Sequence, residues 1–179
     1  AIIAYGGGFI GACTFAVTDS HWFNAVEAEV YAMSTFFTAI VVWIILKWSQ
    51  NIGKIGNTRY ILLIAYMLGL ASGVHLLNLL ALPFIALIVY YKKFPFKWST
   101  FILTGLISIG IYLIIYQGMI KGLPILAHKY NIYVPILLMF SILFVSIYFI
   151  KNKYIELSIV FASMMLIFIG YTSYTTIFI

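Results

Sequence analysis

The residues best able to do chemistry lie in one short segment near the start of the chain. It holds the carboxylate of Asp19 and the imidazole of His21, followed by two further carboxylates, Glu27 and Glu29. Such groups take and donate protons in enzymes, and ionisable residues beside apolar helices mark candidate functional sites. We therefore expect a polar site here, with Asp19, His21 and Asn24 contacting substrate at the water boundary.

The two glutamates have different alternatives. Asn24 and Glu27 have the spacing of a capping box, so Glu27 is predicted either to cap a helix or to take part in chemistry. Glu29 lies beyond the N–H groups that a cap satisfies, and an apolar run follows it. Side chains two residues apart point about 200° apart around a helix, so Glu27 and Glu29 face different sides. Tyr31, four residues after Glu27, shares the face of Glu27. Glu29 and Glu27 are the candidate catalytic residues, and Glu29 is the stronger one.

A second polar group follows in an apolar region, where His75 and Asn78 lie three residues apart. A lone histidine there can simply bond a neighbouring carbonyl, but two polar groups at one depth favour a site. We predict that His75, Asn78 and Tyr31 bind substrate. No pair of histidines has the spacing of a zinc motif, so neither a metal nor another cofactor is expected, although His21 and His75 could hold a divalent ion.

The elements that position these residues are membrane helices. Of 179 residues, 65% are hydrophobic and 8% charged, whereas soluble domains carry about 25% charged residues. This excludes a soluble enzyme, a disordered tail and a nucleic-acid-binding module. The expected fold is all-α, a polytopic transmembrane bundle in one domain over 1–179, as an internal piece of a longer protein. About seven membrane segments are predicted: 2–18, 25–48, 60–72, 76–91, 99–116, 134–150 and 155–171.

Residues 60–91 are predicted to form a short hairpin. As one helix they would measure about 48 Å, against a hydrocarbon core of about 30 Å, so a break near Gly73-Val74-His75 fits better. Eight basic residues then lie on one set of loops and two on the other, which makes the first set cytoplasmic. The first set is Lys47, Lys54, Arg59, Lys92, Lys93, Lys97, Lys151 and Lys153; the second is Lys121 and Lys129. Segments 19–24 and 117–133 are expected as outward-facing loops.

Two groups of glycines are candidates for helix packing, and one group of lysines is a candidate for lipid contact. Gly6 to Gly11 formally match a dinucleotide-binding motif, but no strand precedes them, so close helix packing is the better interpretation. Gly69 and Gly73 have the same small-residue spacing. Lys92, Lys93 and Lys97 are interpreted as an anchor for anionic lipids.

The first half of the chain resembles a known family. The stretch from Phe15 to Ser34, with its Glu-x-Glu-Val-Tyr core, and the stretch from Gly69 to Leu80, with its Gly-x-His-Leu core, carry the likeness. They resemble a bacterial polytopic membrane family related to the protein O-mannosyltransferase-like proteins of animals, which are GT-C glycosyltransferases. Residues 94–179 match only in hydropathy.

The resemblance implies a multi-pass enzyme of the bacterial inner membrane. It would move a mannose-type sugar from a polyprenyl-phosphate donor to Ser or Thr of a protein on the periplasmic face. Its partners would be membrane lipid, the lipid-linked sugar and the acceptor protein, with no nucleic acid. The main catalytic base of such enzymes is expected upstream of residue 1. A non-catalytic scaffold subunit and a secondary transporter are the alternatives.

Overall fold

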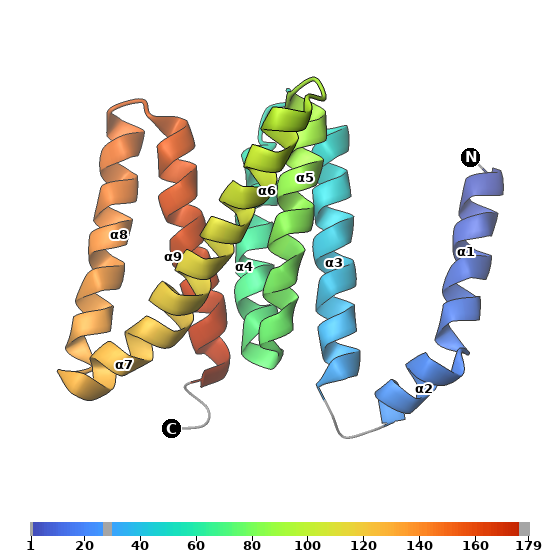
Figure 1. Ribbon diagram of the computed structural model, residues 1–179, viewed down its shortest axis with the longest axis horizontal. Coiled ribbons are helices and arrows are strands. Elements are labelled where there is room, and N and C mark those ends of the chain that lie inside the picture. Colours follow the sequence, from blue (N-terminus) through green and yellow to red (C-terminus); the bar gives the residue numbers. More distant parts are fainter. Residues whose placement is uncertain (1, 27–29, 176–179) are drawn as a thin grey trace.

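The computed structural model describes residues 2–26 and 30–175, and every regular element in this part of the chain is a helix (Figure 1). The expected all-α fold is therefore confirmed. In chain order the elements are α1 (Ile2–Ala16), α2 (Asp19–Val26), α3 (Tyr31–Gln50), α4 (Thr58–Val74), the 3₁₀ helix η1 (Leu76–Leu80), α5 (Ala81–Lys93), α6 (Trp98–Leu113), the π-helix η2 (Ile114–Lys121), α7 (Gly122–Lys129), α8 (Tyr133–Lys151) and α9 (Ile155–Thr175).

The number of membrane segments also agrees with the sequence. Within the described residues, five helical segments are long and apolar enough to span a bilayer, and two shorter apolar helices accompany them. The five are Tyr31–Gln50, Leu76–Lys93, Trp98–Lys129, Tyr133–Lys151 and Ile155–Thr172, and the shorter two are α1 and α4. Many of their apolar side chains are exposed, as expected where the solvent is lipid.

The hairpin over 60–91 is confirmed. Helix α4 ends at Val74, and His75 has an extended backbone (φ −151°, ψ 122°) that no helix can contain. The chain then turns through η1 and returns as α5. Both arms pack on α3, where Ile44, Ile45 and Trp48 form a buried cluster with Ile64 and Leu68 of α4.

The loop predicted over 117–133 is wrong. The chain stays helical from Trp98 to Lys129, through α6, η2 and α7, and runs diagonally across the molecule (Figure 1). Pro124 lies inside α7, and the eight π-helical residues of η2 come just before it. A π segment shifts the hydrogen-bond pattern, which helps a helix to accommodate a proline that lacks an N–H group. Only residues 130–132 connect α7 to α8.

The predicted loop over 19–24 and the predicted start of a helix at residue 25 are also wrong. Residues 19–26 form α2, with Asp19 in its first turn, where a carboxylate is favoured by the helix dipole. Helix α3 begins at Tyr31, after Val30 as N-cap. Asn24 therefore lies inside α2 and cannot cap the helix that follows, which removes the capping-box interpretation. Glu27 itself lies outside the described residues.

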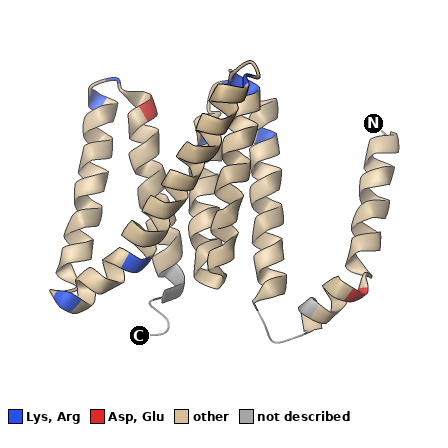
Figure 2. Ribbon diagram, in the orientation of Figure 1, with Lys and Arg blue, Asp and Glu red and all other residues tan. Residues whose placement is uncertain are grey.

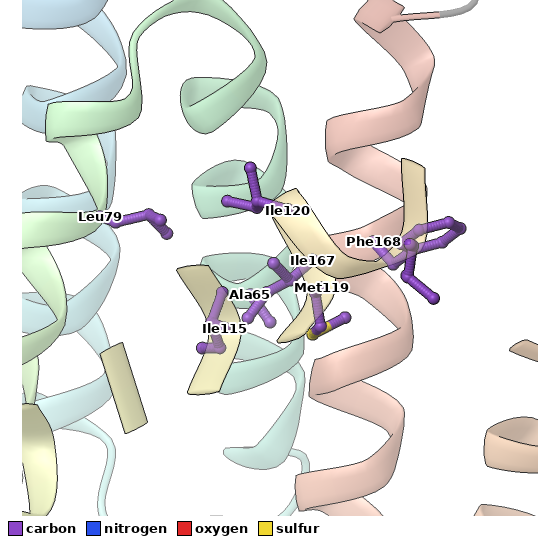
Figure 3. Packing of buried hydrophobic residues seen from close by; sticks show 8 residues of the cluster. Ala65, Leu79, Ile115, Met119, Ile120, Ile167 and Phe168 are labelled. Atoms are coloured by element: carbon purple, nitrogen blue, oxygen red, sulfur yellow. The ribbon is translucent and has the colours of Figure 1, made fainter. Parts of the chain in front are cut away.

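The tightest helix contact joins α4 to α9. Gly69 of α4 lies against the backbone of Ile167, and Gly170 of α9 lies against α4, where an added Cβ would come within 2.6 Å of the Tyr66 carbonyl. Around this crossing a buried apolar cluster joins Ala65, Ile167 and Phe168 to Met119 and Ile120 of η2 (Figure 3). The close packing predicted for Gly69 is thus present, whereas nothing lies within 4 Å of an added Cβ at Gly7 or Gly11.

Charges gather at the two ends of the helices (Figure 2). Helices α3, α5 and α8 finish at one end with Lys47, with Lys92 and Lys93, and with Lys151 in their last turns. We call this the lysine-rich end. Lys121 and Lys129 belong to η2 and α7, at the opposite end.

Candidate functional site

At the end opposite the lysine-rich end, the tip of the α4–α5 hairpin meets the start of α3. The rings of Tyr31 and His75 lie with their centroids 5.7 Å apart and tilted by 42°. Tyr31 begins α3, whereas His75 joins α4 to η1, so the fold brings together two segments far apart in sequence. Tyr31 is 44% exposed, and His75 is half-buried. This pair is open to the surroundings on one side.

The buried side chain of Asn78 joins the hairpin tip to α3 and α4 by hydrogen bonds. Its side-chain oxygen accepts hydrogen bonds from the hydroxyls of Ser34 (2.6 Å) and Thr38 (3.2 Å) of α3. Its amide nitrogen donates to the carbonyl of Ala71 in α4, at 2.7 Å. Asn78 is only 6% exposed. The carbonyl oxygen of an amide has two lone pairs, so both are used by α3.

One of the two ring nitrogens of His75 takes part in a hydrogen bond among the described residues. Its Nδ1 accepts a hydrogen bond from the Leu77 N–H at 3.2 Å, which makes the side chain the N-cap of η1. A neutral imidazole that accepts at Nδ1 carries its proton on Nε2. Among the described residues His75 therefore presents Nε2–H as a donor, a group suited to a phosphate oxygen or a sugar hydroxyl.

The other predicted site residues lie apart from this pair. Asp19 is exposed in the first turn of α2, and the His21 ring packs 4.6 Å from that of Phe15. No ring contact or hydrogen bond among the described residues joins either of them to His75. Asn24 belongs to α2. Both predicted catalytic residues, Glu27 and Glu29, lie outside the described residues.

Sequence reasoning missed Ser34 and Thr38. The two hydroxyls lie four residues apart and therefore on one face of α3. A polar stripe of this kind in an apolar helix is a usable signal, because hydroxyls in membrane helices commonly bond across to a neighbouring helix. The spacing alone does not identify their partner, Asn78, which lies 44 residues after Ser34 and 40 after Thr38.

The cluster can bind and orient a polar group. It supplies the Nε2–H of His75, the Tyr31 hydroxyl and the ring faces of both, on a tip fixed by Asn78. Within the described part of the chain no three of His, Cys, Asp and Glu come together in a way that could hold a metal ion.

Comparison with known proteins identifies the first half of the chain. Residues 1–98, from α1 to the first residue of α6, match the family model described as the protein O-mannosyl-transferase TMEM260 N-terminal domain. No curated protein and no solved structure matches the chain significantly. The matched region contains α3, the hairpin and every side chain of the Tyr31, His75 and Asn78 cluster. The chain, a multi-span helical membrane protein, therefore belongs to the protein O-mannosyl-transferase TMEM260 N-terminal domain family.

Proposed function

We propose that the chain is part of a GT-C-like glycosyltransferase that moves a mannose-type sugar from a polyprenyl-phosphate carrier to Ser or Thr of a protein. Tyr31 and His75, assembled on a tip fixed by Asn78, are the observation that supports this best. In this proposal the Nε2–H of His75 donates to the phosphate–sugar head, and Tyr31 contacts the sugar. Asn78 holds the tip and offers its second amide hydrogen to the substrate.

The proposed sidedness follows from the charges. The lysine-rich end would face the cytoplasm of a bacterial inner membrane, by the positive-inside rule, and the hairpin tip would face the periplasm. A lipid-linked sugar lying along the helices would then present its head at the depth of His75. Asp19, His21 and Asn24 on α2 are proposed to border the same site, since α2 lies at that end of the molecule (Figure 1).

Proton transfer needs a carboxylate, because transfer to a hydroxyl requires a base that takes its proton as the phosphate leaves. Glu29 and Glu27 are our candidates in this chain. A carboxylate repels phosphate, so Glu29 is proposed to contact sugar hydroxyls or to orient a partner.

His75→Asn is the variant that tests the binding role. Asparagine is a favoured N-cap and keeps an acceptor for the Leu77 N–H, but it lacks a group that reaches as far as Nε2. We expect the KM for the lipid-linked donor to rise about tenfold or more, the loss expected for one hydrogen bond to a charged group. The measurement is transfer of labelled mannose from polyprenyl-phosphate-mannose to a Ser/Thr peptide by full-length protein in membranes.

His128→Asn is the matched control, because His128 is an exposed histidine on the last turn of α7, at the same end of the molecule. It should leave transfer unchanged.

In the same assay Glu29→Gln, which keeps the shape and removes the charge, should lower kcat beyond any loss of folded protein. Full activity in both His75→Asn and Glu29→Gln would show that the site lies elsewhere and would favour a scaffold role for this region.

A further inference from the structure

The connection between α5 and α6, at the lysine-rich end, carries an exposed group of lysines and rings. It consists of Tyr91, Lys92, Lys93, Phe96, Lys97 and Trp98, all of them exposed, and we call it the lysine–aromatic platform. It begins in the last turn of α5, whereas His75 lies at the other end of the α4–α5 hairpin, so the proposed transfer reaction does not use it.

The platform is held by a buried tyrosine. Tyr90 is 3% exposed, and its hydroxyl accepts the backbone N–H of Lys97 at 2.9 Å. The same hydroxyl lies 2.7 Å from the Thr100 hydroxyl and 3.1 Å from the Lys97 carbonyl. One side chain of α5 thus fixes the backbone at the start of α6. The platform is therefore a fixed surface rather than a loose connection.

The rings of the platform stack on one another and remain accessible. Tyr91 and Phe96 are stacked, with centroids 6.0 Å apart and an angle of 4° between their planes. Phe96 then meets Trp98 edge to face at 5.3 Å. Trp98 is 70% exposed. Aromatic side chains with this exposure, next to lysines, are typical of the boundary between hydrocarbon and headgroups.

The sequence on either side of the platform carries no carboxylate. The sequence contains no Asp or Glu between Glu29 and Glu156, and Glu156 lies in the first turn of α9. Other cations at the same end have neighbours of their own. Lys54 donates to Asn51 at 3.0 Å, and the Arg59 guanidinium lies over the Tyr60 ring.

We propose that the lysine–aromatic platform binds the phosphate headgroups of anionic phospholipids in the leaflet at the lysine-rich end. The charge of three exposed ammonium groups on a short segment complements a layer of phosphates, and the stacked rings set the depth at which the segment lies. The fixed backbone keeps the three charges together, so little ordering is needed when lipids bind.

Quenching of Trp98 by brominated lipids tests the proposal. The full-length protein is placed in nanodiscs with dibromo-phosphatidylglycerol or dibromo-phosphatidylcholine, and tryptophan fluorescence is measured. The fluorescence of Trp98 is the difference between the unchanged protein and the Trp98→Phe variant. We expect half-maximal quenching with the anionic lipid at a mole fraction at least about tenfold lower than with the phosphatidylcholine. Changing Lys92, Lys93 and Lys97 to Gln together should remove most of this preference, because each lysine near an anionic surface contributes about 1 kcal/mol.

The matched control changes Lys47, Lys54 and Arg59 to Gln, which removes the same charge at the same end, and it should retain the preference. Tyr90→Phe keeps all three lysines but loses the hydroxyl contacts, and it should weaken the preference; circular dichroism verifies that each variant is folded. Equal quenching by the two lipids in the unchanged protein would overturn the proposal. An equal loss in the control triple variant would also overturn it, since general attraction would then suffice.

Discussion

At the scale of single residues, Asn78 shows how one side chain can join three helical segments. Its oxygen bonds α3 twice, its nitrogen bonds α4, and its own backbone belongs to η1. A buried amide without these partners would be costly, because water does not replace them. The hydrogen bonds of Asn78 therefore also hold His75, three residues before it, in position.

Asn78→Ala tests this at the level of stability. We expect the free energy of unfolding to fall by roughly 1 to 3 kcal/mol, since the Ser34 and Thr38 hydroxyls and the Ala71 carbonyl lose a partner. Unfolding by denaturing detergent, followed in bicelles, measures the difference. Asn131→Ala is the control, because Asn131 is exposed and its oxygen only approaches the Tyr133 N–H at 3.5 Å. A loss no larger than the control's would contradict the role given to Asn78.

The residue types of the site could be predicted from the sequence, but not all of their partners. His75 stands out because the chain has only three histidines, Asn78 because it lies three residues from His75, and Tyr31 because it lies four residues after Glu27. Helical spacing placed His75 and Asn78 on one face, whereas the residues between them form an extended turn and a 3₁₀ helix. The pairing of Asn78 with Ser34 and Thr38 depends on how α3 packs against the hairpin, which spacing within one segment does not contain.

At the scale of elements, two apolar stretches of equal length behave differently. Residues 60–91 break at His75, whereas residues 98–129 stay helical over 32 residues. The break predicted for the first stretch is present, whereas the loop predicted over 117–133 in the second is absent. The long helix avoids it by running diagonally and by passing through η2 (Figure 1). Tilt depends on packing against neighbours, so sequence length alone does not fix it.

Gly69→Ala tests the α4–α9 contact. The added methyl group would overlap the Ile167 backbone, so the helices must separate, at a cost of about 1 to 3 kcal/mol in the free energy of unfolding. Gly105→Ala in α6 is the matched control, because nothing lies within 4 Å of its added Cβ. We expect the control to be unchanged or slightly more stable, as alanine favours helix. Equal stability of the two variants would show that α4 and α9 do not pack this closely.

At the scale of the whole molecule, the separation of charge predicts how the protein lies in its membrane. The test uses a background with the exposed Cys13 changed to Ser. Ile55→Cys reports the lysine-rich end, because Ile55 is fully exposed between α3 and α4, and Asn131→Cys reports the opposite end. An impermeant thiol reagent added outside cells should label position 131 and should label position 55 only after permeabilisation. Labelling of position 55 in intact cells would reverse the topology.

Helix α4 has a consequence for the bilayer itself. At 17 residues it is about 25 Å long, shorter than a typical hydrocarbon core of about 30 Å, while the helix over 98–129 exceeds that core. The molecule thus combines negative and positive hydrophobic mismatch, and local thinning of the lipid is one way to match the short side. Such a dimple would bring the headgroups of the far leaflet down toward His75. The membrane around the hairpin tip would then be part of what delivers a lipid-borne phosphate to the depth of that imidazole.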